Sequence, residues 1–189
     1  MAREVMGTRA RRVVTLACLS ATALTTLAVG LHAQSTVRRC GLEFTLPGGW
    51  TIVPDPYVVE PECGLLLRPI AWDSLLVEQD SVDFFTILVR TSAVGFVQAV
   101  VTSAFELTEG AWWVNGRLGL RNEASAISRN GWQGVIGYGP FGCYRIGGGY
   151  AGVCDFPVAL VGTHTLSAII EGGPDDVFHA VLDGLRFVP

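Results

Sequence analysis

Four cysteines follow the first 33 residues of the chain, at positions 40, 63, 143 and 154. An even number of cysteines in an exported chain indicates two disulfide bonds. Three pairings are possible, and we favour the two that close short loops, Cys40–Cys63 and Cys143–Cys154. The alternatives are a metal site and a thiolate nucleophile beside an imidazole. The absence of a C-x-x-C pattern, with only two histidines after residue 33, disfavours the metal site.

His179 lies between Asp175 and Asp183 in a segment with helical periodicity. The i, i+4 spacing places these three side chains on one helix face, where a carboxylate could orient the imidazole for proton transfer. No nucleophile candidate accompanies them in the sequence. We therefore expect a solvated polar face, and we expect His164, which lies beside a predicted turn, to be exposed as well.

Residues 137–142 (GYGPFG) match the glycine pattern of dinucleotide-binding loops. That use requires a preceding strand, a following helix and an acidic residue about 20 positions later. Here Pro140 interrupts the pattern and a glycine-rich extended segment follows, so we predict a turn and no cofactor. A cluster of four acidic residues could be considered for calcium binding: Asp73, Glu78, Asp80 and Asp83. Their spacing lacks the signature of a calcium-binding loop, so we expect a solvated surface.

Aromatic residues are interspersed with glycines in the second half of the chain. Exposed rings on strands can stack on sugars or dock a protein. They can equally fill the core of a sheet made of short strands, which is the interpretation we favour. The possible binding surface consists of Trp112, Trp113, Trp132, Tyr138, Tyr144 and Tyr150.

The segments before residue 115 alternate between extended and helical patterns. Short strands are predicted at 42–46, 50–53 and 63–67, and a short helix could lie within 70–80. Residues 82–89 (VDFFTILV) are nearly all apolar and predict a central strand covered on both faces.

A helix of about three to four turns is expected next, capped by Thr91 or Ser92 and ending near Gly110. Its apolar face would carry Val97, Val100, Val101, Ala104 and Phe105.

From Asn115 onward, glycines predict short strands joined by tight turns, with hairpins around 147–149 and 162–163. Pro174 then begins a final helix whose buried stripe is Val177, Phe178, Val181, Leu182 and Leu185. The order of elements predicts one α+β domain over residues 34–189, with a mostly antiparallel sheet covered by helices.

Residues 1–33 have the form of a secretory signal peptide. Arginines precede an uncharged run from Val13 to Val29, and Ala33 is a small residue at the expected cleavage point. The alternative is a retained membrane anchor, but a run of 17 residues diluted by Thr and Ser is marginal for crossing a bilayer. We expect cleavage before Gln34, a secreted or periplasmic protein, and no stable membrane anchor afterwards.

Composition excludes several classes of function. With 50% hydrophobic and 16% charged residues the chain is not disordered. All 13 basic residues are arginine, which excludes lysine Schiff-base and P-loop chemistry. Removing the four arginines and Glu4 of the signal peptide changes the net charge from −4 to −7. Such acidity argues against nucleic acid as a partner.

Two stretches of the sequence carry a family resemblance. FTLPGGW (44–50) resembles the opening strand and turn of PsbP-like domains, and FHAVLDGLRF (178–187) resembles their closing helix and tail. The resemblance covers most of residues 42–187. It implies a helix-covered antiparallel sheet used mainly for docking or binding, and it implies no catalytic residue at the matched positions.

These observations predict an exported bacterial domain that binds a ligand or has a structural role, without catalysis, cofactor or metal. Its partner would be a protein or a carbohydrate. The alternative is a secreted hydrolase with its site in the glycine-rich loops. That enzyme would need Cys143, His164 or His179 to meet an acid in one cleft, whereas paired cysteines and dispersed histidines would favour the binding domain.

Overall fold

The structure is a computed structural model, which describes residues 34–55, 58, 62–71, 85–144 and 149–189. Several sequence predictions lie outside these residues: the signal peptide, most of the segment 70–80, the acidic group from Asp73 to Asp83, and most of the turn at 147–149. No helix among the described residues is long and apolar enough to cross a membrane.

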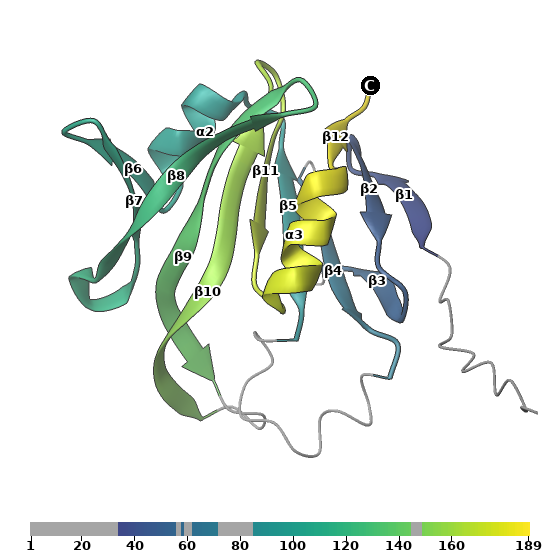
Figure 1. The fold of residues 1–189 in the computed structure, drawn as a ribbon, viewed down its shortest axis with the longest axis horizontal. Coiled ribbons are helices and arrows are strands. Elements are labelled where there is room, and N and C mark those ends of the chain that lie inside the picture. The colour runs from purple at the N-terminus through teal and green to yellow at the C-terminus, as the bar shows by residue number, and fades with distance from the viewer. Residues whose placement is uncertain (1–33, 56–57, 59–61, 72–84, 145–148) are drawn as a thin grey trace, which may run out of the picture. The chain divides into compact units, whose positions relative to one another are not determined.

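Nine strands form one antiparallel sheet, in the order β3-β4-β5-β11-β10-β9-β8-β7-β6 (Figure 1). Their bounds are β3 Trp50–Pro54, β4 Cys63–Pro69, β5 Ile87–Ser92, β6 Phe105–Thr108, β7 Ala111–Asn115, β8 Arg121–Arg129, β9 Trp132–Tyr144, β10 Tyr150–Gly162 and β11 Ser167–Glu171. A second sheet has the order β1-β2-β12, with β1 Ser35–Arg39, β2 Leu42–Leu46 and β12 Arg186–Phe187.

Helices are few: α2 spans Phe96–Thr102, α3 spans Asp175–Gly184, and a 3-10 turn, η2, spans Arg117–Gly119. The fold is therefore α+β, as predicted, but the sheets dominate it, and the two helices cover only parts of the large sheet.

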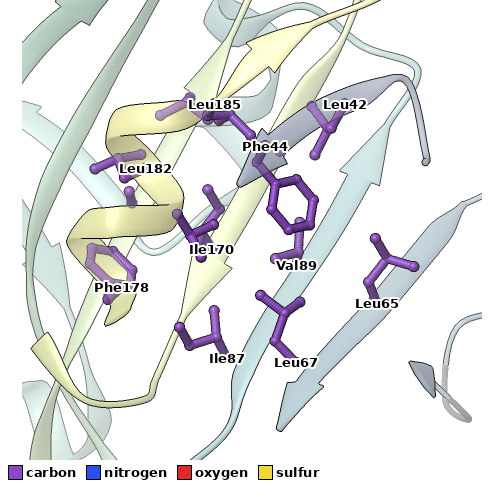
Figure 2. Packing of buried hydrophobic residues seen from close by; sticks show 14 of the residues in the cluster. Leu42, Phe44, Leu65, Leu67, Ile87, Val89, Ile170, Phe178, Leu182 and Leu185 are labelled. Carbon is purple, nitrogen blue, oxygen red and sulfur yellow. The ribbon is translucent and has the colours of Figure 1, made fainter. Parts of the chain in front are cut away.

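Alternate residues of each strand point to opposite sides of the nine-stranded sheet. One side, the α3 face, packs against α3 and the small sheet. Val161 of β10 and Ile170 of β11 point to this side and belong to one buried cluster with Phe44 from β2 and Phe178 from α3 (Figure 2). The other side, the α2 face, packs against α2 through residues such as Val158 and Leu160.

Helix α3 follows its sequence pattern. The predicted stripe of Val177, Phe178, Val181, Leu182 and Leu185 is buried, which confirms the prediction. Pro174 is the N-cap residue with an extended backbone, and Asp175 and Asp176 occupy the first turn, where carboxylates favour the positive end of the helix dipole. Asp175, His179 and Asp183 are exposed, also as predicted.

Helix α2 is shorter than predicted, and the prediction of a helix continuing to Gly110 was wrong. The Ser103 hydroxyl donates to the Val100 carbonyl at 2.9 Å and accepts from the Phe105 amide at 3.1 Å. A serine that bonds the backbone in this way offers an alternative to the next helical hydrogen bonds. The chain therefore leaves the helix at Ser103, and residues 105–108 form β6 instead.

The start and the buried face of α2 also differ from the prediction. Thr91 and Ser92 belong to β5 rather than capping the helix, and the N-cap is Gly95. A Cβ at Gly95 would lie 2.1 Å from the His164 carbonyl oxygen, so only glycine allows this close approach. The buried residues are Phe96 and Ala99, whereas Val97 and Val101, which we expected to be buried, are 75% and 82% exposed.

The glycine-rich region contains long strands rather than the expected short ones. Strands β9 and β10 have 13 residues each, and residues 137–142 lie within β9 instead of forming a turn. A Cβ at Gly137 would lie 2.9 Å from Val114 Cγ2 and 3.1 Å from the Ala124 Cβ. Glycine inside a strand marks such a close approach. The central strand likewise begins at Ile87, not at residue 82.

Both favoured disulfides are present. Cys40–Cys63 joins the turn after β1 to the start of β4, with the two Cα atoms 5.5 Å apart. Cys143–Cys154 links β9 to β10, with a Cα–Cα distance of 5.7 Å. The predicted hairpins that flank residues 147–149 and 162–163 are both formed by antiparallel pairs, β9–β10 and β10–β11.

Candidate binding surface

The six aromatic residues singled out in the sequence do not gather in one place. Trp132 is 2% exposed, and its indole Nε1 donates to the Leu185 carbonyl at 2.9 Å. Trp112 points to the α2 face, where its ring centroid lies 6.5 Å from that of Phe96. Trp132 is thus a core residue and Trp112 is partly one.

The remaining aromatic residues divide between two regions. Tyr150 is 53% exposed at the start of β10 and pairs through the backbone with Tyr144 of β9. Trp113 follows Trp112 and points to the opposite side, the α3 face. Tyr138 is 42% exposed on the same face, because its neighbour Gly137 is aligned with Ala124 and Trp112 on the α2 face.

Trp113 lies in a row of residues that crosses three strands. Glu106 of β6 is opposite Trp113 of β7, which is opposite Glu123 of β8. With Arg121 and Tyr138 these residues form what we call the Trp113 surface. Glu106, Arg121 and Glu123 are exposed, and Trp113 is half-buried. Helix α3 packs over β5 and β11, whereas β6 and β7 extend away from it (Figure 1).

An arginine is stacked on the central ring of this surface. The guanidinium carbon of Arg121 lies 4.4 Å from the centroid of the Trp113 ring, within the range of a cation–π contact. The contact places the guanidinium over a ring whose strand neighbours are Glu106 and Glu123.

Hydrogen bonds hold the Glu106 carboxylate in place. It accepts from the Thr108 hydroxyl at 2.7 Å and from the Asn115 amide at 2.9 Å. These two bonds, with a smaller contribution from the positive charge of Arg121, lower the pKa of Glu106. The carboxylate is therefore ionised at neutral pH and is a fixed acceptor.

Tyr138 is anchored to the start of α3. Its hydroxyl donates to Asp175 Oδ2 at 2.9 Å, and this bond is the main reason that the pKa of Tyr138 is raised. The Asn122 amide donates to the Tyr138 carbonyl and to Asp155 Oδ1, both at 2.9 Å. The bond to Asp175 thus holds the ring, and the bond from Asn122 holds the Tyr138 backbone, at the edge of the Trp113 surface.

The residues proposed for the alternative hydrolase are far less organised. Cys143 is bonded to Cys154 and is not available as a thiolate. His164 lies in the turn between β10 and β11, beside Gly95 at the start of α2. His179 lies on α3, with its ring 5.6 Å from that of Phe178. The two histidines therefore lie in different elements, one in a turn beside the start of α2 and the other on α3. Within the described ranges, no three His, Cys, Asp or Glu residues converge as a metal site requires.

Sequence reasoning found Trp113 and Tyr138 but missed the polar residues around them. The signal was present: Arg121, Glu123 and Ser125 alternate with Asn122 and Ala124, a period of two that places the first three on one side of a strand. Without the pairing of β7 with β8, nothing in the sequence relates that side to Trp113.

No family model and no curated protein matches the chain. Among solved structures it is similar to the solution structure of cyanobacterial PsbP (CyanoP) from Synechocystis sp. PCC 6803. The two chains are 13% identical, the TM-score is 0.44, and the match covers 84% of this chain and 95% of that chain. The resemblance is a weak one, and it concerns the fold.

Proposed function

We propose that the chain is an exported, non-catalytic domain that binds a neutral carbohydrate at the Trp113 surface. The observation that carries the proposal is the row of Glu106, Trp113 and Glu123, with the Arg121 guanidinium stacked on the central ring. A sugar has apolar C–H faces that pack on aromatic rings, and hydroxyls that both donate and accept. The exposed ring of Tyr138 offers such a surface, and at Trp113 a sugar would pack against the edge of the ring and the guanidinium that covers it. The two carboxylates accept hydrogen bonds, and the guanidinium donates them.

The spacing of the rings suits more than one sugar unit. Trp113 lies on β7 and Tyr138 on β9, two strands apart, which corresponds to about 10 Å across a sheet. Because both rings are held by neighbouring groups, little side-chain freedom is lost on binding. A chain of linked sugars could therefore contact both rings along the row.

Export is supported by the signal-peptide pattern at 1–33 and by the two disulfides, which persist in oxidising compartments. The intact mass of the protein recovered from its native host tests this part. We expect a chain beginning at Gln34; a mass that includes residues 1–33 would contradict cleavage.

Binding should be measured by calorimetry with soluble neutral oligosaccharides of the cello-, xylo-, malto- and chito- series. We expect at least one series to bind, and Trp113→Ala to weaken it about tenfold or more, as truncation of a central aromatic contact does. Val101→Ser is the matched control, because Val101 is exposed on the α2 face and its replacement should leave the affinity unchanged. Failure of all four series, or equal affinity of Trp113→Ala and wild type, would reject the carbohydrate. Binding of a protein alone would also reject it.

A further inference from the structure

A cavity of about 170 Å³ lies on the α2 face, beside α2 and strands β5, β10 and β11. Leu160 and Ile169 form its apolar floor, and Ala99 lines it from α2. Arg90, Ser167 and Glu62 are among its polar lining. The cavity therefore combines an apolar surface with one positive group, one negative group and a hydroxyl.

Arg90 is held in a defined orientation. Its Nε donates to Asp55 Oδ2 at 3.0 Å, and the Asp55 side chain is only 2% exposed, whereas that of Arg90 is 43% exposed. The strand register places Arg90 opposite Ile169, which is opposite Leu160. A buried carboxylate thus fixes the Nε side of the guanidinium, and no further hydrogen bond to the terminal nitrogens is found among the described residues.

Ser167 supplies a hydroxyl group to the lining of the cavity. It is 2% exposed and lines the cavity opposite Ser92. The side chains that the structure describes provide no hydrogen-bond partner for its hydroxyl. The hydroxyl oxygen is not among the fully buried side-chain atoms without a partner, so it is accessible from the cavity. It can hydrogen-bond there to water or to a ligand.

Glu62 gives the cavity a second charge. It precedes Cys63, which pairs with Thr91, so Glu62 lies across from Ser92 and diagonally from Arg90. It is exposed, and it lines the cavity. A ligand with a carboxylate alone would meet the repulsion of Glu62, and one with an amine alone would meet that of Arg90. A ligand carrying both charges satisfies both groups.

We propose that this cavity binds a free α-amino acid with a small apolar side chain. Its carboxylate would accept from the Arg90 terminal nitrogens and the Ser167 hydroxyl, its ammonium would donate to Glu62, and its side chain would pack on Ile169. The volume equals the liquid volume of about six waters and lies below the range of about 300–1,000 Å³ for drug-sized ligands. This site lies on the other side of the sheet from the Trp113 surface and does not depend on it.

Three matched probes test the charge requirement: L-valine, 3-methylbutanoate, which lacks the ammonium, and isobutylamine, which lacks the carboxylate. Each is titrated into the ¹⁵N-labelled protein without residues 1–33, and amide shifts are followed. We expect saturable shifts at Ala99, Ser167 and Ile169 with L-valine, and affinities at least about tenfold lower for the other two probes, since each loses a charge-assisted hydrogen bond. Absence of saturable shifts with L-valine, or equal binding of 3-methylbutanoate, would overturn the proposal.

Variants locate the site. Arg90→Gln would leave Asp55 buried without its cation, so the primary variants are Ser167→Val and Glu62→Gln, which keep that ion pair. Both should weaken L-valine binding about tenfold or more at an unchanged thermal midpoint, and Trp113→Ala should leave it unchanged. Wild-type affinity in Ser167→Val would overturn the cavity as the site. Loss of L-valine binding in Trp113→Ala would place the L-valine site on the α3 face, and this result would also overturn the proposal.

Discussion

The two faces of the nine-stranded sheet are packed in different ways. On the α3 face, a ten-residue helix and a three-stranded sheet bury large side chains such as Phe44 and Phe178, each 1% exposed or less. On the α2 face, a seven-residue helix leaves Val97 and Val101 exposed and borders the cavity beside Arg90. The same sheet thus buries more large side chains on one face and borders a cavity on the other.

The strongest test of this contrast compares two phenylalanines. Phe178→Ala should lower the free energy of unfolding by about 3–5 kcal/mol, because the side chain is completely buried. Phe96→Ala should cost about 3 kcal/mol or less, because Phe96 is 8% exposed and lies at the start of a short helix. Denaturant unfolding of both variants measures the difference. A larger loss for Phe96→Ala would reverse the assignment of the two faces.

The disulfide between β9 and β10 joins strands that contribute to both faces. Replacing Cys143 and Cys154 by serine should lower stability by about 2–3 kcal/mol, since the unfolded chain regains the freedom of an 11-residue separation. Hydrogen exchange should show that both faces lose protection together. Thiol titration of the denatured, unreduced wild type without residues 1–33 should find no free thiol; two or more would contradict the pairing.

Substitutions at exposed positions should change the stability of the protein only slightly on both helices. His179→Ala on α3 and Val101→Ser on α2 should each change the free energy of unfolding by less than about 0.5 kcal/mol, because both side chains are exposed. Thermal melts of the two variants are sufficient. A loss comparable to that of Phe178→Ala at His179 would show that the imidazole has a structural or functional role that its exposure does not reveal.

The contrast between the helices also explains what the sequence could predict. The stripe of α3 extends over nearly three turns and starts after Pro174, so periodicity and capping agree and the buried face is predicted correctly. In α2 the helical spacing of apolar residues continues past Ser103 to Phe105, which is the first residue of β6. Phe105 fits the apolar spacing of a helix as well as the alternation of a strand, so the pattern alone does not show where the helix ends. The side-chain hydrogen bonds of Ser103 end the helix, and periodicity does not report them.

Features of the candidate sites were predictable from the sequence only where all the residues involved lie in one segment of the chain. The exposure of His179 and the local pairing of the cysteines follow from sequence spacing. The Trp113 surface needs three strands in register, and the cavity needs Glu62, Arg90 and Ser167 from three segments. Ser167 in particular has no distinctive sequence context, and only the fold places it in the lining of the cavity.

The strand order has a consequence for how the chain acquires this structure. From β6 to β11 every strand pairs with its neighbour in sequence, and β3, β4 and β5 do the same. These two meanders meet only where β5 pairs with β11, joining Ser92 to Ser167 across 75 positions. Closing a local hairpin costs little chain entropy. Bringing together residues 75 positions apart costs more, and this loss occurs before the new contacts can offset it. The β5–β11 seam, which also borders the cavity, is therefore expected to be the step that limits the rate of folding.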